Sequence, residues 1–210
     1  NNCEIIFAPH INEMYPNEDV ITITHAGIYG DYGQTLSLEK EKEHKAKAVE
    51  MLKPFVDKKY PSPVSQDRIL AYNQYYYHSG QYKKQYEYGK KVVVQGGIGC
   101  AVLIAVGGSM HALELDSQNE IYKARVMALA ARQTWEELYD FSIPQMRQAA
   151  YENSFYVSSL ALTGECTQAQ DLFDTVIKES KRFAEMERWY QKFNPAKLNN
   201  CQPNRQLTGQ

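Results

Sequence analysis

Apolar residues on both sides of Gly164 recur at helical spacing. Tyr156 and Leu160 lie four residues apart before this glycine, and Ala169 and Phe173 lie four apart after it. Residues at this spacing share one face of an α-helix. Because glycine readily adopts the left-handed backbone that ends many helices, the pattern predicts two helices joined by a tight turn.

The same arrangement occurs earlier in the chain, around Gly80. Tyr72 and Tyr76 share a helical face before this glycine, and Tyr82 and Tyr86 begin another face after it. The pattern therefore predicts a second pair of helices, joined at Gly80 by the same kind of turn.

Together these two segments resemble the tetratricopeptide repeat, a family of helix pairs that stack side by side. The resemblance implies an α-solenoid in which the first helix of each pair lines a concave, partner-binding face. The match lies in the turn glycines and in positions of the second helices. The matching residues are Gly164, Ala169, Phe173, Val176, Gly80 and Tyr82.

The chain departs from the repeat at several positions. Gln85 stands where the earlier copy should have a small residue, and Gly89 stands where it should have an aromatic one. Lys181 occupies the place of the repeat's closing proline. The two turn glycines are 84 residues apart, whereas one repeat spans roughly 34 residues, so a longer or irregular segment must lie between them.

We therefore expect an all-α fold, in which antiparallel helix pairs stack as a short, irregular α-solenoid. The helical domain should span residues 37–193, followed by a polar C-terminal tail over 194–210. Residues 1–36 form an irregular N-terminal segment, whose β-branched stretch 20–24 is consistent with a short strand or with a first helix. A non-repeat helical bundle and a mixed fold are the alternatives.

Residues 92–113 form a stretch of 22 residues without any Asp, Glu, Lys or Arg. A membrane span is one interpretation, but five glycines, Gln95 and His111 argue against it. A dinucleotide-binding loop is another, but Gln95 and Cys100 stand where its fingerprint needs glycines. We favour a third interpretation, a glycine-rich turn that leads into a buried central helix over 98–115.

Two further helices are expected on either side of this segment. The first covers 37–60, carries a solvated run of mixed charges that includes His44, and should kink or end at Pro54. The second covers 118–141 and places several alanines on one side, which lets a neighbouring helix approach closely.

Composition narrows the range of partners. The formal net charge is -2, with 23 basic and 25 acidic residues, so no basic excess points to nucleic acid. Tyrosine is abundant, with 16 residues against 7 Phe and 2 Trp. Its large ring and polar hydroxyl suit a half-buried binding surface, or else it replaces Phe and Leu in a weakly apolar core.

The four cysteines lack the close pairs that zinc sites and thioredoxin-like motifs require. Cys3 and Cys201 each follow two asparagines near an end of the chain, and we expect a disulfide between them. Such a disulfide favours an exported, periplasmic protein, whereas a first residue other than Met fits either a trimmed signal peptide or a chain cut at another point. Free thiols in a cytosolic protein are the alternative.

No motif in the sequence assembles a reaction centre. The five histidines lack the His-Glu-x-x-His spacing of a helix-borne zinc site, and the nucleophile-elbow and phosphate-loop motifs are absent. Cys100 with His78 or His111 would form a nucleophile pair, but apolar surroundings raise the pKa of a thiol. We therefore expect neither a cofactor nor a metal.

The leading hypothesis is a non-catalytic module that binds another protein or a peptide in a tyrosine-rich concave groove. The resemblance implies that groove residues lie on the first helix of each pair. Those positions lack a lysine or arginine clamp, so the groove should prefer an apolar or amide-rich partner anchored by aromatic rings. The expected groove residues are Asp67, Gln74, Tyr77, His78, Tyr151, Ser154, Phe155 and Ser158.

One concrete form of this hypothesis is an exported bacterial adaptor or a toxin-neutralising (immunity) protein. The alternative is a cell-envelope enzyme whose active site draws on the histidine-bearing and glycine-rich segments. A homo-oligomer that assembles through its tyrosine-rich faces is a third option. A histidine and a carboxylate that meet in a deep pocket would favour the enzyme, whereas a shallow groove would favour the binding module.

Overall fold

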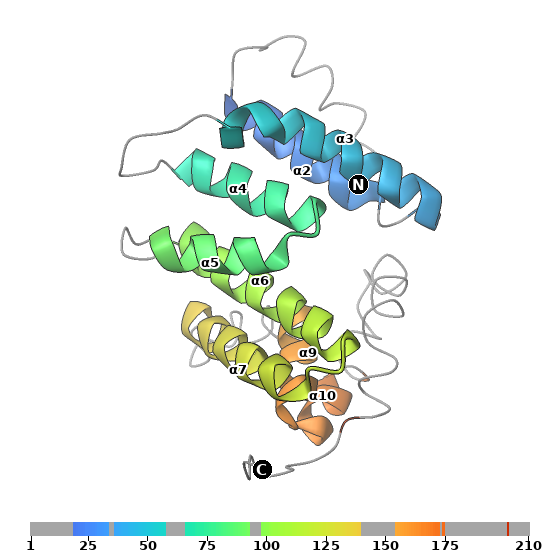
Figure 1. Ribbon diagram of the computed structural model, residues 1–210, viewed down its shortest axis with the longest axis vertical. Helices are drawn as coiled ribbons and strands as arrows, with labels where there is room; N and C mark the ends of the chain where they lie inside the picture. Colours follow the sequence, from blue (N-terminus) through green and yellow to red (C-terminus); the bar gives the residue numbers. More distant parts are fainter. Residues whose placement is uncertain are drawn as a thin grey trace.

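The computed structural model describes residues 19–33, 36–57, 66–92, 98–139, 154–172, 174 and 201 (Figure 1). Within these ranges the regular elements are helices and no strand occurs, so the all-α prediction is confirmed. In chain order the helices are α2 (Asp19–Gly33), α3 (Leu38–Asp57), α4 (Gln66–His78), α5 (Tyr82–Val92), α6 (Ile98–Ser117), α7 (Ile121–Leu138), α9 (Ser154–Thr163) and α10 (Cys166–Leu172).

The β-branched segment 20–24 lies inside α2 and is helical. Ile23 and Ala26 of this helix are fully buried in an apolar cluster with Leu52 of α3 and Ala71 of α4. Burial in this cluster overrides the strand propensity of the segment, because tertiary packing outweighs the weak intrinsic preference of single residues. Of the two expectations for this stretch, the first helix is correct and the strand is wrong.

Helices that are neighbours in the chain pack against each other in pairs. The pairs are α2 with α3, α4 with α5, α6 with α7, and α9 with α10. Successive pairs also touch through their first helices, since α2 contacts α4, α4 contacts α6, and α6 contacts α9. Figure 1 shows the result as an elongated succession of helices, with α2 and α3 at one end and α9 and α10 at the other.

Gly80 and Gly164 form the turns that join α4 to α5 and α9 to α10. Their φ angles are 68° and 91°, in the left-handed region that favours glycine. The Gln81 amide donates to the Tyr76 carbonyl at 2.8 Å, and the equivalent bond at the Gly164 turn is 3.0 Å. This bond defines the Schellman helix stop, so both predicted turns are confirmed.

A third turn of the same type joins α6 to α7 at Asn119. Its φ is 62°, and the Glu120 amide donates to the Leu115 carbonyl at 2.9 Å. Asparagine adopts this backbone more readily than other residues that carry a side chain. The α6–α7 pair therefore occupies the 84-residue interval between the two glycines, and Asn119 divides it into 39 and 45 residues.

The central helix predicted over residues 98–115 is α6. It contacts α4, α5, α7 and α9, and its buried residues include Leu103, Met110 and Leu113. α5 approaches α6 closely because Gly107 faces the contact: a Cβ there would lie 2.7 Å from the Tyr86 backbone nitrogen. Within the described ranges no helix, α6 included, combines the length and apolarity needed to cross a membrane.

Gln85 shows how the packing differs from that of the repeat. Its side chain is fully buried, and its amide donates to Asn73 Oδ1 of α4 at 2.6 Å. A Cβ on Gly107 of α6 would lie 3.0 Å from the Gln85 Cβ. Gly107 on the next helix thus makes room for the Gln85 side chain.

α3 carries the predicted charge run. The helix continues past Pro54 and ends at Asp57, so the alternative in which it ends at this proline is wrong. His44 is half-buried, and its ring stacks on Tyr29 of α2, with centroids 4.2 Å apart. The prediction of a solvated His44 is therefore wrong, because α2 packs against this part of α3.

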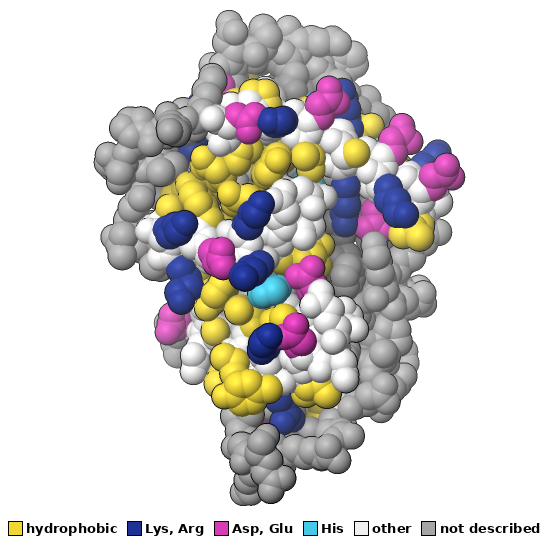
Figure 2. All heavy atoms as spheres, in the orientation of Figure 1, with side chains coloured by type: hydrophobic (Ala, Val, Ile, Leu, Met, Phe, Trp, Pro, Cys, Tyr) yellow, Lys and Arg dark blue, Asp and Glu magenta, His cyan; other side chains and the backbone are white. Residues whose placement is uncertain are grey.

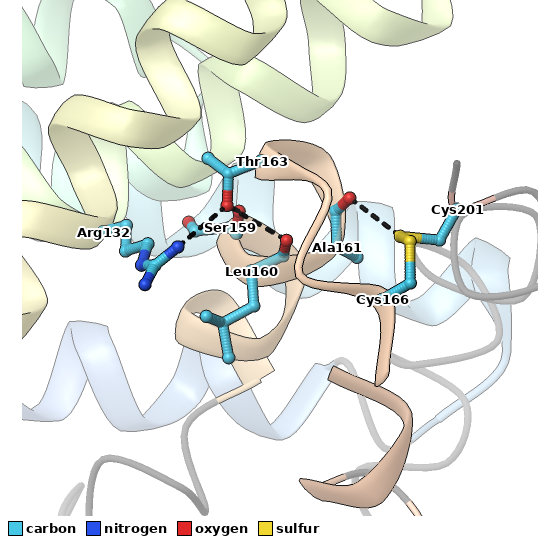
Figure 3. Close-up of a disulfide and its surroundings, with 7 residues drawn as sticks. All are labelled: Arg132, Ser159, Leu160, Ala161, Thr163, Cys166 and Cys201. Atoms are coloured by element: carbon cyan, nitrogen blue, oxygen red, sulfur yellow. Dashed lines mark hydrogen bonds between the residues drawn. A yellow bond between two sulfur atoms is a disulfide. The ribbon is translucent and has the colours of Figure 1, made fainter. Parts of the chain in front are cut away.

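The disulfide joins Cys166 to Cys201 (Figure 3). Cys166 is the first residue of α10, two positions after the Gly164 turn, and the Cys201 Sγ also lies 3.1 Å from the Ala161 carbonyl oxygen. The predicted pairing of Cys3 with Cys201 is wrong, because similar sequence surroundings carry no information about distance in the fold. Cys3 itself lies outside the described residues.

Candidate functional site

Two of the expected groove residues meet in the fold although they are 78 positions apart in the chain. Tyr77 lies near the end of α4 and Phe155 near the start of α9, and their ring centroids are 6.1 Å apart with planes at 83°. Such an edge-to-face arrangement is favourable for aromatic pairs. Both side chains are half-buried, so each keeps part of its surface in contact with solvent.

The Tyr82 ring extends this contact to α5. Its centroid lies 6.2 Å from that of Tyr77, and both rings border the apolar cluster around Met110. Phe155 also stacks on Trp135 of α7, with centroids 6.4 Å apart and planes at 10°. We refer to Tyr77, Tyr82 and Phe155 as the aromatic patch, which joins helices from distant parts of the chain.

His78 and Ser158 are buried, so the expectation that they line an open groove is wrong. His78 packs against α2, where a Cβ on Gly30 would lie only 2.4 Å from its ring. Ser158 is 1% exposed because every residue of α9 over 156–162 is buried. The prediction required α9 to turn one face to solvent, whereas this stretch is enclosed on all sides.

For the remaining expected groove residues, the structure describes only the side chain of Gln74, which packs against α2. Gln74 is half-buried, and its amide lies against α2, where a Cβ on Gly27 would be 3.0 Å from the Gln74 Cδ. Asp67 and Ser154 belong to α4 and α9, but their side chains lie outside the described part of the structure. Tyr151 lies outside it as well.

An ion pair of α3 borders the aromatic patch. The Lys45 Nζ lies 2.8 Å from a Glu41 carboxylate oxygen, and both side chains are largely buried. The same ammonium lies 5.7 Å from the centre of the Tyr77 ring, within the range of cation–π attraction. This pair was not predicted from the sequence, because a run of alternating charges is typical of a solvated helix face.

His78 and Asp31 approach each other beside this ion pair. The His78 Nε2 is 4.0 Å from the Asp31 Oδ1, too far for a hydrogen bond. Burial, and then the Lys45 charge, lower the pKa of His78 to about 4, while the Gly27 backbone acts in the opposite direction. The imidazole is therefore neutral at neutral pH.

Asp31 lies at the solvent-exposed edge of this group. Burial among protein atoms raises the pKa of Asp31 to about 6, and the Lys45 charge acts against that rise. Solvent reaches 57% of the side chain, and this hydration also favours the charged form. We therefore treat Asp31 as a carboxylate at neutral pH.

Two carboxylates act on the hydroxyl group of Tyr82. Burial, followed by the charges of Glu114 and Glu41, raises the pKa of Tyr82 to about 12, so the phenol stays protonated. Glu114 lies on α6, where its carboxylate is 2.9 Å from the Nδ1 of His111. Acidic groups from α3 and α6 thus flank the aromatic patch.

Another group of tyrosines, also half-buried, packs between α4 and α5. The Tyr72 and Tyr88 rings have centroids 4.3 Å apart, and Tyr76 lies 6.2 Å from Tyr88. The Tyr72 hydroxyl donates to the Val56 carbonyl of α3 at 3.2 Å. Both interpretations of the tyrosine content therefore apply: the Tyr156 ring is 1% exposed and fills the core, whereas the rings between α4 and α5 and those of the aromatic patch are half-buried.

The surface is mixed in charge. Figure 2 shows Lys, Arg, Asp and Glu side chains interspersed with apolar ones over the visible helices, without a large area of one sign. No group of three or more potential metal ligands occurs among the residues that the structure describes. No protein-family model matches the chain, and no curated protein or solved structure matches it either. The functional assignment therefore rests on the site itself.

Proposed function

We propose that this protein is a non-catalytic module that binds a segment of another protein at the aromatic patch. The main support is the contact between Tyr77 and Phe155, which come from different helix pairs and remain half-buried. Half-buried aromatic rings are typical anchors of protein interfaces, because they offer a large contact area and lose little side-chain freedom on binding.

We further propose that the helix pairs form a short, irregular α-solenoid. The first helices touch in succession, and α3, α5 and α7 each contact the first helix of the following pair. Stacked helix pairs of this kind form curved surfaces that hold partner segments. Tyr77 and Phe155 both belong to first helices, which is consistent with a partner site on that surface.

An oxidising compartment is the third part of the proposal. The Cys166–Cys201 disulfide supports it, because disulfides persist in exported proteins and are rare in the cytosol. An exported adaptor or a toxin-neutralising protein combines such a compartment with a surface for one protein partner.

Two histidine–carboxylate pairs bear on the alternative of a cell-envelope enzyme. His111 and Glu114 lie within one turn of α6 and form a local pair. His78 approaches Asp31 at 4.0 Å, but its side chain is 0% exposed and packs against Gly30. Because a general base must reach the proton that it removes, the enclosed His78 favours the binding module over the enzyme.

The experiment is a comparative pull-down from the native host, read by mass spectrometry. The wild-type chain is compared with a Tyr77→Ala/Phe155→Ala double variant and with Tyr122→Ala, a matched control because Tyr122 is 67% exposed on α7. We expect a partner that wild type and Tyr122→Ala capture equally and that binds the double variant about tenfold more weakly in calorimetry.

Equal capture of every protein by all three chains would contradict the proposal. Circular dichroism and thermal melting check that the double variant keeps its fold. If it does not, a Tyr77→Leu/Phe155→Leu variant replaces it, because leucine keeps much of the apolar volume while removing the rings.

A further inference from the structure

The helix α7 turns a second apolar face to solvent. Val126 and Leu129 are 49% and 43% exposed, and Tyr122 on the same side is 67% exposed. Because each residue advances about 100° around a helix, these three lie opposite the buried Ala128 and Trp135, which face the interior. An apolar face that continues over about two helical turns suits contact with another molecule.

Two residues of opposite charge lie on this face, one towards each end of α7. The Lys123 side chain is 69% exposed, and Glu137 is exposed as well. Ala130 lies midway, seven residues from each, and because seven residues make almost two helical turns, the three share one stripe. The Lys123 ammonium also pairs with Glu120, three residues earlier. Exposed pairs of this kind are weak, and an ammonium has further donors for a second carboxylate.

This arrangement is complementary to itself. If two copies of α7 lie antiparallel about a two-fold axis at Ala130, Lys123 of each copy faces Glu137 of the other. The small side chain of Ala130 lets the two helices approach closely, and Val126 and Leu129 pack on both sides of the crossing. A parallel arrangement would instead bring like charges together, so the charge pattern selects the antiparallel one.

We propose that the outer face of α7 binds the same face of a second copy of this chain and forms a reversible homodimer. The inference is independent of the proposed function at the aromatic patch. A contact made by one helix from each copy belongs with interfaces below roughly 1,200 Å² of buried surface, so we expect a Kd on the order of tens of micromolar. By mass action the chain is then monomeric at the low concentrations of an unfolding experiment, where Tyr122 remains exposed.

The experiment is sedimentation equilibrium of the full chain, with its disulfide intact, at concentrations from well below to well above the expected Kd. Wild type is compared with Lys123→Glu, with Glu137→Lys, with an equimolar mixture of these two variants, and with the double variant that exchanges the charges. Lys83→Glu on α5 is the matched control, because the Lys83 side chain is 68% exposed and also pairs with a glutamate one turn away.

Each single charge reversal should raise the dimer Kd at least about tenfold, because like charges then face each other at both ends of the contact. The mixture should form heterodimers, and the double variant homodimers, about as tightly as wild type, since opposite charges face each other again. Leu129→Ala should weaken the dimer by about three- to tenfold through lost apolar contact. Lys83→Glu should leave the Kd unchanged.

Three results would overturn the inference. They are a chain that stays monomeric at every concentration, a dimer that neither single reversal weakens, and a dimer that the mixture and the double variant both fail to restore. Circular dichroism checks that each variant is folded. The Tyr77→Ala/Phe155→Ala variant should dimerise like wild type, so a failure of this inference can be distinguished from a failure of the proposed function.

Discussion

The two ends of the molecule bring helices close together with different side chains. Where α4 crosses α2, glycines of α2 face polar side chains of α4. A Cβ on Gly30 would lie 2.4 Å from the His78 ring, and one on Gly27 would lie 3.0 Å from the Gln74 amide carbon. This contact is therefore close and largely polar.

Where α7 meets α6, alanines of α7 face a glycine of α6. Ala128 and Ala131 are fully buried, and a Cβ on Gly108 of α6 would lie 3.0 Å from the Ala131 Cβ. Trp135 of α7 and Leu160 of α9 lie in a separate apolar cluster. The only polar atom of the Trp135 ring donates to the Ser109 hydroxyl at 3.2 Å.

The two helix contacts differ in how well their buried polar atoms are hydrogen-bonded. Buried polar atoms cost free energy unless they are hydrogen-bonded, and His78 has two ring nitrogens without a well-formed bond in the described chain. At the other end the Trp135 ring nitrogen is hydrogen-bonded, and the Ser158 hydroxyl of α9 is buried without a partner in the described residues. We infer that the α6–α7–α9 contact supplies most of the stability, while the α2–α4 contact holds polar groups in place beside the aromatic patch.

The largest effect should come from the apolar end. Trp135→Ala removes a ring that is 3% exposed, and we expect a loss of about 3–5 kcal/mol in the free energy of unfolding, measured by urea denaturation. Tyr122→Ala on the same helix is the control and should change stability by less than about 0.5 kcal/mol. Similar losses in the two variants would contradict the assignment of stability to this cluster.

Acidification should act mainly on the polar end. The folded-state pKa of His78 is about 4, below the unfolded value of 6.5, so the unfolded chain binds a proton at a higher pH than the folded chain does. The contribution of His78 to stability is therefore present above pH 6.5 and is lost as the pH falls towards 4, by roughly 2–3 kcal/mol.

The groups that face His78 modify this dependence. Asp31 of α2 has a raised pKa and acts in the opposite sense, and Lys45 of α3, which is paired with Glu41, is the cation that faces both groups. Urea denaturation between pH 7 and 4 should show a flatter pH profile for His78→Gln than for wild type. A profile that is the same in both chains would show that His78 is not enclosed.

A smaller effect should follow from adding one methyl group at the polar contact. Gly30→Ala places a Cβ against the His78 ring, and we expect a loss of about 1–3 kcal/mol from overpacking. In a His78→Ala background the same substitution should cost almost nothing, because the ring that it displaces is gone. If the double-mutant cycle shows no coupling free energy, the side chain at position 30 and the His78 ring are not in contact.

Local structure was predicted well where residues within the element itself determine its conformation. Gly80 and Gly164 end helices because their φ is positive, and α6 is central because no charge interrupts its first part. Asn119 forms an identical turn but was missed, since asparagine is common on helix surfaces and only its observed φ reveals its role. The helical state of α2 depends on burial against α3 and α4, which no local pattern contains.

The site was predicted only in part for the same reason. The repeat register placed Tyr77 and Phe155 on first helices, and the fold brings their rings into contact. Lys45 was missed because its helix reaches the aromatic patch only through tertiary packing. The disulfide partner of Cys201 was likewise set by the fold, which positions Cys166 beside it.

The smallest effects should appear at the helix-ending turns, which both ends share. A Cβ on Gly80 would meet nothing within 4 Å, so Gly80→Ala should cost only the strain of its positive φ, about 1 kcal/mol. Asn119→Gly should change stability by less than about 0.5 kcal/mol, because relief of strain and loss of chain entropy nearly cancel. Thermal melting of both variants checks this ranking, and a reversed order would contradict it.

The bond between Cys166 and Cys201 closes a covalent loop whose two ends are 35 positions apart. A protease that cuts once inside this loop creates a new pair of chain ends but releases no fragment. The nicked protein would migrate as one species until a reducing agent separates its two pieces. For a protein exposed to extracellular proteases, this topology allows a cleavage event without loss of the C-terminal portion.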